Sequence, residues 1–541
     1  MSRQWTGNET VTIADGHLQG IRLAQSQVMA WLGVPYAQPP VEKLRWKAPR
    51  KLTPWDGIRS AQSYGDSSVQ FFEGKTIGNE DCLYLNIWRP DHSKTALPVF
   101  VFAHGGGNLG GSGLDFSGEQ LANATNSIII SINYRLGAMG FFRHPALRSG
   151  DPLDDSGNYG LLDLIHALKW VQQNIASFGG NPDNVTLAGQ SAGARNALAA
   201  YLSPLGKGLF HKLFAMSGGM TTASAEHGDI KANELLTALL INSGLTSEPD
   251  EALAWSSHQS ADTIAQFLYD QPADSFSKVL ITYDTGLRMV GFPHLFEDGI
   301  VLPKGGFEQL QHNSSPALPI ILGSTSTEFS IFTLFNPYFS ASTVDEILAK
   351  VMGQKDLYEA AVQYGSELNA AFNVEQTAQA IAKAVPNTSI FAYRFCWGMH
   401  DEVIDPSARL LLGAPHGVDI PFLTGDYTGM TRMFARGIIT EANEPGREKL
   451  SSLLRSYLQN FLHSGNPNSD TLPQWQQWSD NHEASDILSL NASLEEIIVH
   501  MDPKLEPQDI NYRMNNDERL QPEQRKWLED VLLKGRFFVK H

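Results

Sequence analysis

The sequence predicts an α/β fold built on a large, mostly parallel central sheet. Four short apolar runs, at 97–103, 127–133, 185–188 and 212–217, lack polar alternation, which is typical of strands buried on both faces. Segment 161–175, between the second and third runs, carries apolar residues at helical spacing. Strands that alternate with helices form parallel sheets, and such sheets bind ligands beyond the carboxyl ends of their strands.

The N-terminal region predicts smaller β elements. Residues 9–25 alternate apolar and polar side chains and indicate an antiparallel hairpin that turns at 15–16. Residues 31–40 contain three prolines, at 35, 39 and 40, and predict an irregular loop. Residues 80–89 alternate again and indicate a strand.

The second half of the chain continues the alternation of strands and helices. Strands are predicted at 319–323, 389–396 and 487–490, helices at 448–462 and 527–533, and a polar surface segment at 502–522. No internal repeat or linker divides the chain. We therefore expect one catalytic domain over 1–541, with helical insertions near 225–295 and 335–385 and a C-terminal extension over 502–541.

The composition describes a globular protein. The chain has 541 residues, 42% of them hydrophobic, and a formal net charge of −18. It has no cluster of Lys and Arg, which argues against nucleic-acid binding, and no apolar run near the roughly 18 residues of a membrane span. The first 20 residues lack a signal-peptide pattern, and the two cysteines, Cys82 and Cys396, favour free thiols. We expect a cytoplasmic protein, for which a monomer is a reasonable state.

Residues 189–193 form a G-x-S-x-G motif between an apolar run and a helix-favouring segment. A strand–turn–helix context is what a nucleophile elbow requires, because the turn exposes the serine hydroxyl. The motif alone is common, and a serine in a turn of small residues is the alternative. Ser191 is thus a candidate nucleophile that needs a base, an acid and an oxyanion hole.

A glycine-rich loop supplies a candidate oxyanion hole. The H-G-G-G run at 104–107 directly follows a buried strand, as in the donor loops of lipases and esterases. The same loop contains a formal G-x-G-x-x-G at 105–110, which suggests a dinucleotide site. That alternative is disfavoured because 111–113 continue the loop and no acidic residue ends the next strand.

The candidate base and acid follow Ser191 in the chain. His416 lies in the small-residue loop G-A-P-H-G-V-D, between apolar segments. Glu328 follows the strand predicted at 319–323 by a short polar loop, which places it at a carboxyl end. Other carboxylates occupy the same interval, so position alone favours Glu328 without selecting it.

Several ordered motifs together resemble the type-B carboxylesterase, or cholinesterase-like, family of α/β-hydrolases, including its bacterial para-nitrobenzyl-esterase-like members. They span most of the chain: G-V-P-Y-A-x-P-P at 33–40, E-D-C-L-Y-L-N-I-W at 80–88, N-Y-R-L-G at 133–137, F-G-G-N-P at 178–182, and the loops described above. The resemblance implies an α/β-hydrolase fold with helices on both faces of the sheet. It also implies a small-molecule ester substrate and no metal or other cofactor.

The resemblance assigns roles to individual residues. Those that would perform the chemistry are Ser191 as nucleophile, Glu328 as acid, His416 as base, and the N–H groups of Gly106, Gly107 and Ala192 as oxyanion donors. Those that would support it are Gln190, Ser217 and Asp419. Two further pairs, Arg45 with Glu80 and Arg135 with Asp163, match structural ion pairs of the family.

The chain departs from the family at informative positions. Gln190 replaces a frequent glutamate, which removes a negative charge beside the nucleophile. Ser68 replaces the cysteine that pairs with the equivalent of Cys82, so loop 69–81 has no disulfide. That loop also lacks the tryptophan of a cation-binding platform. Thr327 and the residue after Glu328 also differ from the family pattern, which bears on the geometry of that loop.

Five aromatic residues are candidates for the substrate pocket: Phe71, Phe72, Phe292, Phe329 and Phe332. A run of aromatics at near-helical spacing more often belongs to a core, so that alternative stays open. The sequence therefore predicts a serine carboxylesterase that hydrolyses neutral, apolar esters through an acyl-enzyme. An amidase, thioesterase or specialised hydrolase with the same triad, and a non-catalytic adhesion homologue, are the alternatives.

Overall fold

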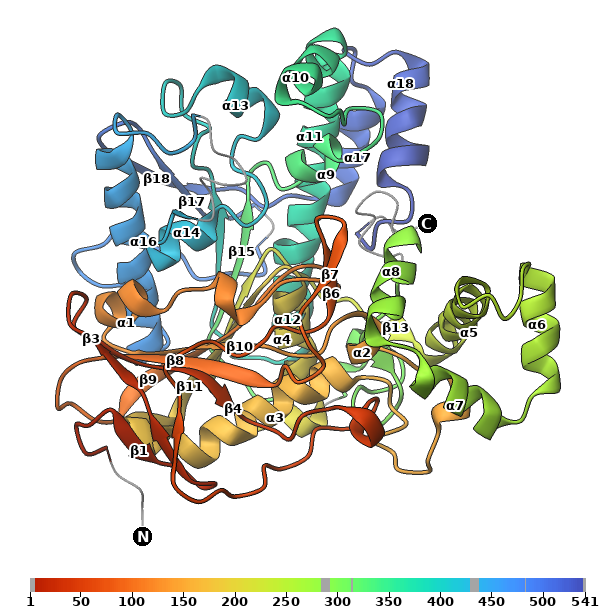
Figure 1. Ribbon diagram of the computed structural model, residues 1–541. Helices are drawn as coiled ribbons and strands as arrows, with labels where there is room; N and C mark the ends of the chain where they lie inside the picture. Colours follow the sequence, from red (N-terminus) through yellow and green to blue (C-terminus); the bar gives the residue numbers. More distant parts are fainter. Residues whose placement is uncertain (1–4, 284–291, 313–314, 429–436, 482, 539–541) are drawn as a thin grey trace.

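The computed structural model describes residues 5–283, 292–312, 315–428, 437–481 and 483–538. Its centre is an 11-stranded sheet with the strand order β18-β17-β16-β15-β12-β11-β9-β10-β8-β4-β3 (Figure 1). The strands are β3 (Ile21–Leu23), β4 (Val28–Pro35), β8 (Tyr84–Pro90), β9 (Leu97–Ala103), β10 (Ile128–Ile132), β11 (Gly180–Gln190), β12 (Lys212–Met216), β15 (Ile320–Thr325), β16 (Ile390–Phe395), β17 (Ile487–Ala492) and β18 (Ile497–Asp502).

The middle of this sheet is parallel, as predicted. The strands from β10 across to β17 pair in parallel, and antiparallel strands flank them at both edges. Alternate residues of β9 enter different cores: Val99 and Val101 belong to one apolar cluster, and Phe100 and Phe102 to another. Burial on both faces explains why these strands are continuous apolar runs.

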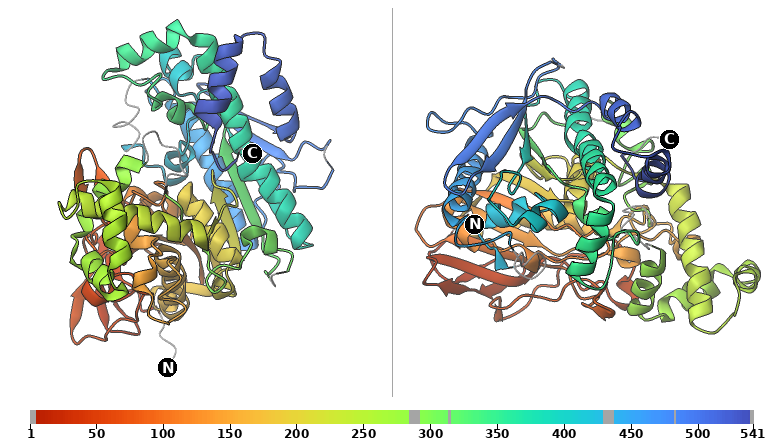
Figure 2. Two further views of the ribbon diagram at one scale, coloured as in Figure 1. Left: turned by 90° about the vertical axis from the view of Figure 1, so that its right-hand side faces the viewer. Right: turned by 90° about the horizontal axis from the view of Figure 1, so that it is seen from above.

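Helices cover both faces of the sheet (Figure 2). On one side α3 (Tyr159–Asn174) and α4 (Ala192–Leu202) pack in the first cluster, and on the other α1 (Glu119–Thr125) and α16 (Glu444–Ser464) pack in the second. Helix α4 starts where β11 ends and contacts that strand. The prediction of an α/β-hydrolase fold is confirmed.

Helices occupy both regions in which insertions were predicted. The first contains α5 (Ala225–Asn242), α6 (Pro249–His258), α7 (Ala261–Asp270) and α8 (Ala273–Tyr283), and its α5–α7 part projects from the body in Figure 1. Residues 284–291 of this predicted insertion lie outside the described residues. The second region contains α10 (Val344–Gly353), α11 (Lys355–Ala370), a π-helical turn (Ala371–Gln376) and α12 (Thr377–Ala384), and α9 (Ser330–Leu334) directly precedes it.

The C-terminal extension packs against the second insertion. Helices α17 (Pro507–Asn515) and α18 (Pro522–Trp527), with the π-helical segment Leu528–Leu533, share an apolar cluster with α11. Ile510 and Met514 of α17 are buried, so the polar segment predicted at 502–522 also buries one face of a helix. In the part of the chain that the structure describes, no helix has the length and apolar character to cross a membrane.

Two sequence predictions need correction, and one strand was missed. The loop predicted at 31–40 is wrong up to residue 35, because β4 continues there and pairs with β8 around a bulge. Pro35 ends the strand, where no ladder N–H is needed. The edge strand β18 was not predicted. Segment 69–81 is not an open loop but contains a hairpin of β6 (Gln70–Phe72) and β7 (Lys75–Ile77). The hairpin predicted within 9–25 is confirmed in β1 (Thr10–Thr12) and β2 (His17–Gln19).

Candidate active site

Ser191 lies on a sharp turn between β11 and α4. Its backbone angles are φ 58° and ψ −120°, a conformation that side-chain-bearing residues rarely adopt. The turn is tight because two chain segments meet there: a Cβ on Gly189 would lie 2.3 Å from the carbonyl carbon of Gly193, and a Cβ on Gly193 would lie 2.0 Å from the Ala103 oxygen. The two glycines of the motif are therefore required sterically.

Glu328 and His416 form a hydrogen-bonded pair beside this turn. Glu328 is fully buried three residues after β15, and one of its carboxylate oxygens accepts a hydrogen bond from His416 Nδ1. The other accepts from the Ser217 hydroxyl and, at 2.8 Å, from the Thr325 N–H. Burial alone would raise the pKa of Glu328, but the interaction with His416 and these hydrogen bonds lower it below its ordinary value.

Gln190 contacts the other side of the imidazole. Its Nε2 lies 3.1 Å from His416 Nε2. An amide NH₂ only donates, so the ring nitrogen accepts, and the ring proton stays on Nδ1 toward Glu328. Among the described residues Ser191 Oγ has no hydrogen-bond partner. The contact expected between serine and histidine is therefore replaced in this state by the contact between Gln190 and His416.

The glycine-rich loop after β9 curls over the turn at Ser191. Gly106 has φ +99°, and its oxygen accepts from the N–H groups of Leu109 and Gly110 at 3.0 Å each. A Cβ on Gly106 would lie 2.1 Å from the Gly110 oxygen. No described residue accepts a hydrogen bond from the N–H of Gly106, Gly107 or Ala192, so these donors are available to an incoming oxyanion.

One residue that the sequence reasoning missed holds this loop in place. The buried Gln70 side chain accepts from the Gly111 N–H at 2.8 Å and donates to the Gly111 oxygen at 3.0 Å. It thus pairs with both backbone groups of one loop residue. A polar side chain within a short strand is the only sequence signal of this contact.

Asp419 is a second buried carboxylate near the pair. Its Oδ2 accepts from the Tyr393 hydroxyl at 2.6 Å, whereas its Oδ1 is buried without a partner. Burial raises the pKa of Asp419 to about 6, and the charge of Glu328 adds to this effect. The Asp419 carboxyl therefore takes up its proton near pH 6, well above the ordinary range of an aspartate.

An apolar cavity of about 220 Å³ adjoins the oxyanion loop. Its walls come from four segments: the loop itself (Leu109 and Gly110), the β6 region (Val69 and Phe71), residues 136–139, and α8 (Ala273, Phe276, Ser277 and Leu280). The cavity therefore has a predominantly hydrophobic lining that includes two residues of the oxyanion loop, which suits an apolar group of a substrate.

The five predicted pocket aromatics have different surroundings. Phe71 lines the apolar cavity, and the ring of Phe332 lies 5.4 Å from that of His416. Phe329 is buried against Phe538, Phe292 is half-buried against the core, and Phe72 is 55% exposed. Two of the five thus face the cavity or the imidazole.

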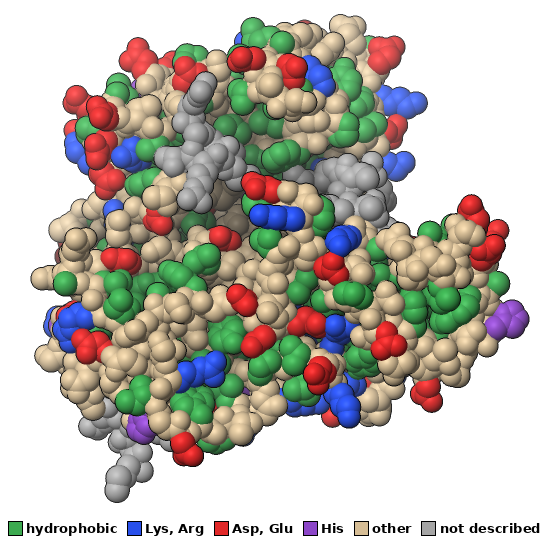
Figure 3. Space-filling view, viewed as in Figure 1, with side chains coloured by type: hydrophobic (Ala, Val, Ile, Leu, Met, Phe, Trp, Pro, Cys, Tyr) green, Lys and Arg blue, Asp and Glu red, His purple; other side chains and the backbone are tan. Residues whose placement is uncertain are grey.

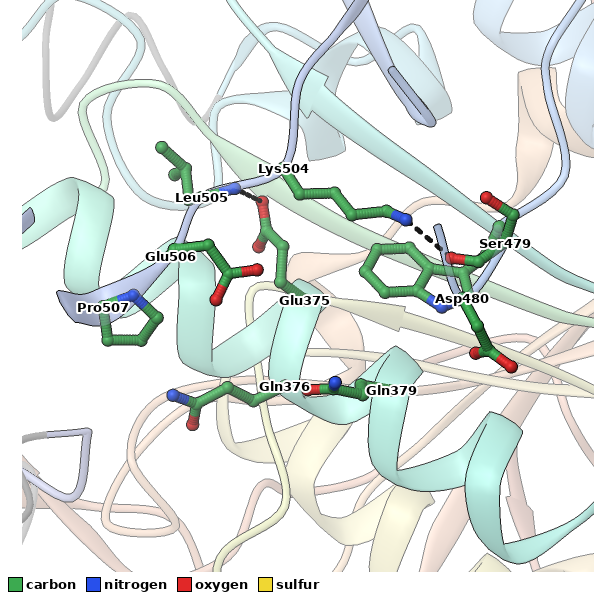
Figure 4. A pocket seen from close by; sticks show the side chains of 10 residues that line it. Glu375, Gln376, Gln379, Ser479, Asp480, Lys504, Leu505, Glu506 and Pro507 are labelled. Atoms are coloured by element: carbon green, nitrogen blue, oxygen red, sulfur yellow. Dashed lines mark hydrogen bonds between the residues drawn. The ribbon is translucent and has the colours of Figure 1, made fainter. Parts of the chain in front are cut away.

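A small pocket elsewhere is a poor candidate for the active site (Figure 4). It lies between Glu375 of the π-helical turn and Lys504, and its volume of about 20 Å³ has room for roughly one water molecule. Glu375 accepts there from the Leu505 N–H, and Lys504 donates to the Ser479 oxygen.

The two predicted ion pairs are formed. Arg45 Nε lies 2.6 Å from Glu80, and Arg135 Nη2 lies 2.7 Å from Asp163.

The described residues contain no group of three or more His, Cys, Asp or Glu side chains arranged to hold a metal ion. On the face shown in Figure 3, acidic and basic side chains are interspersed rather than gathered by sign.

Comparison with known proteins gives consistent matches. The family model described as "Carboxylesterase family" matches residues 7–351 and 338–512. Para-nitrobenzyl esterase of Bacillus subtilis is 29% identical over 517 residues, covering 92% of this chain and 97% of that protein. Fumonisin B1 esterase of Sphingopyxis macrogoltabida is 40% identical over 228 residues, 41% of this chain and 42% of the relative. A solved structure titled "PNB ESTERASE" superposes with a TM-score of 0.71 at 27% identity, covering 93% of this chain and all of that one.

Proposed function

The chain belongs to the carboxylesterase family, and we propose that its catalytic residues are Ser191 as nucleophile, His416 as base and Glu328 as acid. The protein is a carboxylic ester hydrolase. The observation that best supports these assignments is that Glu328, hydrogen-bonded to His416 Nδ1, leaves Nε2 as the proton acceptor beside the strained turn of Ser191.

In the proposed mechanism, Ser191 Oγ attacks the ester carbonyl carbon and its proton passes to His416 Nε2. The Gln190 amide must first leave this nitrogen, because a protonated Nε2 cannot accept its hydrogen bond. Glu328 stabilises the imidazolium that results. His416 then protonates the leaving alcohol, and water, activated by the same nitrogen, hydrolyses the acyl-enzyme.

The negative charge of the tetrahedral intermediate would be bound by the N–H groups of Gly106, Gly107 and Ala192. Each such donor is worth about 2.7–4 kcal/mol of activation free energy in comparable enzymes. Their lack of internal acceptors supports this role, since a donor already bonded within the protein would have to break that bond first. The mechanism uses no metal or other cofactor.

We propose that the apolar cavity binds a neutral, apolar group of the ester. Leu109 and Gly110 belong both to the oxyanion loop and to the cavity wall, so a bound group there would place the carbonyl near the donors. Phe71 and Phe332 are the aromatic residues with the best-placed side chains. Phe292 and Phe329 would act through packing, whereas Phe72 is 55% exposed.

We also take residues 1–541 as one catalytic domain, because a single sheet draws strands from residue 21 to residue 502. The free thiols of Cys82 and Cys396 favour a reducing compartment, and we propose the cytoplasm. Cell fractionation that recovers the protein outside the cytoplasm would contradict this location.

Labelling with a fluorophosphonate tests the nucleophile. We expect the wild type to hydrolyse p-nitrophenyl esters and to carry the label on Ser191, identified by peptide mass spectrometry. Ser191→Ala should lose both, while Ser217→Ala, a matched change at a supporting serine, should retain the label. A panel of p-nitrophenyl esters, thioesters and anilides separates an esterase from a thioesterase or amidase.

A further inference from the structure

Arg195 is a buried arginine whose guanidinium has no hydrogen-bond or ion-pair partner in the described part of the chain. Its side chain is only 2% exposed, and its Nη2 is buried without a partner. It lies in α4, one turn after the candidate nucleophile, and its backbone N–H donates to the Ser191 oxygen at 3.1 Å. An unpaired buried charge is strongly unfavourable, so its presence calls for a reason.

Other buried arginines of this protein are paired. Arg89 donates to four backbone oxygens, and Arg135 forms its ion pair with Asp163. Arg447 donates to the Asn443 side chain at 3.0 Å. The lack of a partner at Arg195 is therefore a local feature of the helix that begins at the nucleophile.

A second buried cation lies next in the chain to an aromatic residue that Arg195 contacts. Its guanidinium lies 5.4 Å from the centre of the Phe537 ring. The neighbouring Arg536 is 3% exposed and lies 5.8 Å from the centre of the Phe332 ring, which in turn is 5.4 Å from the His416 ring. The C-terminal segment thus contacts Arg195 through Phe537, and it contacts Phe332 through Arg536, whose Nε also donates to the Leu532 oxygen at 3.3 Å.

We infer that Arg195 binds a carboxylate carried by the ester substrate, with Arg536 as a second cation on that side. The inference rests on the proposed role of Ser191 as nucleophile. A guanidinium offers paired N–H groups that match a carboxylate in a bidentate contact. Arg195 lies in the first turn of α4 and its backbone N–H reaches the Ser191 oxygen at 3.1 Å, so a carboxylate a few bonds from the ester carbonyl would be close to this turn.

The substrate class is then a half-ester: one group fills the apolar cavity, and a carboxylate pairs with Arg195. Burial lowers the pKa of Arg195 to about 10, so the group is still a cation at neutral pH and gains from a bound anion. The net charge of −18 does not oppose this contact, because salt screens distant charges beyond about 8 Å, whereas Arg195 would act at hydrogen-bond distance.

Matched ester pairs test the inference. In the first pair the acyl part carries the charge: ethyl hydrogen succinate against its neutral isostere ethyl 4-methylvalerate. In the second the alcohol part carries it: O-butyrylglycolate against isobutyl butyrate. We expect the wild type to favour the charged member of one pair in kcat/KM, and the pair that responds identifies which part of the ester faces Arg195.

The variants assign the effect to this side chain. In Arg195→Met the ratio of kcat/KM for charged over neutral ester should fall by about 100-fold, since a buried charged hydrogen bond is lost. Arg195→Lys should restore part of it. Arg59→Met, which removes an exposed cation elsewhere, should leave the ratio at its wild-type value. A wild type without preference in either pair, or a ratio retained in Arg195→Met, overturns the inference.

Binding of succinate by the wild type, measured by calorimetry, adds a test that needs no turnover and no variant. We expect succinate to bind at least 10-fold more tightly than butyrate. Equal binding of the two acids, together with equal rates within both ester pairs, overturns the inference. Because the fluorophosphonate label on Ser191 is read separately, loss of the proposed nucleophile and loss of carboxylate recognition give different results.

Discussion

Both carboxylate oxygens of Glu328 and both ring nitrogens of His416 have partners inside the protein, whereas the Ser191 hydroxyl and the three candidate oxyanion N–H groups have none among the described residues. The acid–base half of the candidate site is thus complete in the folded chain. The nucleophile half consists of a strained serine and N–H groups without acceptors. Folding fixes the first half, and the second is left for the substrate to complete.

This difference is what transition-state binding requires. Donors that are satisfied only by the developing oxyanion contribute to the rate rather than to ground-state stability. Because Glu328 already holds the ring proton of His416 on Nδ1, the reaction requires no further free energy to select the correct tautomer. The strain at Ser191 is held by the packing of Gly189 and Gly193 against neighbouring backbone.

Removing the contact between Glu328 and His416, in the acid–base half of the site, should have the largest effect on kcat. In Glu328→Gln the side-chain amide replaces an acceptor with a donor toward His416 Nδ1, which favours the wrong tautomer. We expect kcat to fall by about 10⁴-fold, as for the equivalent change in other triads. Steady-state kinetics measures it, with fluorescence-monitored unfolding as the control for a lost fold. A loss below 10-fold would mean that Glu328 does not orient His416.

Disturbing the oxyanion loop, in the nucleophile half of the site, should lower kcat by a smaller factor. In Gly106→Ala the new Cβ would lie 2.1 Å from the Gly110 oxygen, so the loop must shift. Its N–H groups would then no longer point at the position of the oxyanion. We expect kcat to fall by about 10²–10³-fold. Gly107→Ala, at a neighbouring donor, should cost less than Gly106→Ala, since no atom lies within 4 Å of its added Cβ and only the backbone conformation resists it. Equal rates in the wild type and Gly106→Ala would argue against this oxyanion hole.

Asp419 tests how the complete half responds to pH. Burial raises the pKa of Asp419 from 3.8 to about 6, so the folded protein favours the neutral acid. The neutral Asp419 therefore contributes fully to the free energy of unfolding below about pH 4. This contribution is lost as the pH rises through about 6, because the carboxyl then ionises in the folded protein. Asp419→Asn removes this loss, and Asn can still accept from Tyr393.

The free energy of unfolding of Asp419→Asn, relative to the wild type, should therefore rise between pH 4 and pH 7. The shift of about two pKa units sets an upper limit of about 3 kcal/mol. Urea denaturation at pH 4, 5, 6, 7 and 8 measures it, and Asp405→Asn, at an exposed helix cap, is the control. A difference that is constant with pH contradicts the predicted ionisation.

Gln190 precedes the nucleophile and contacts His416, so it connects the two halves of the site. A charge at this position should have the smallest effect, and this effect should be on substrate preference. Gln190→Glu places a carboxylate beside His416 and should favour cationic substrates. We expect kcat/KM for butyrylcholine, relative to 3,3-dimethylbutyl butyrate, to rise by about 10-fold at low salt. Gln190→Met, a neutral change of similar size, is the control. No change with Glu would show that this side chain does not influence substrate charge.

The same division appears in what the sequence could predict. The parallel strands were predictable because burial on both faces makes them continuous apolar runs, and the G-x-S-x-G turn because its glycines are required sterically. Glu328 needed the family resemblance, since several carboxylates follow Ser191. Strand β4 was missed because its glycine and proline resemble loop signals, although a bulge and the strand end accommodate them.

Contacts between side chains distant in the chain were not predictable. The contact of Gln190 with His416 depends on how two rotamers meet across 226 positions. The missing partner of Arg195 emerges only when every surrounding side chain is in place. A single sequence contains no periodicity or motif that reports such contacts.

The hold of Gln70 on Gly111 has a consequence for how this enzyme could change over evolution. In the absence of a disulfide, the oxyanion loop is tied to the β6–β7 hairpin by one side chain whose neighbour Phe71 lines the apolar cavity. Substitutions in a short surface hairpin can therefore alter cavity shape and donor geometry together, without touching the nucleophile turn. New substrate preferences would be accessible here through few mutations, because no disulfide in this hairpin has to be preserved or replaced.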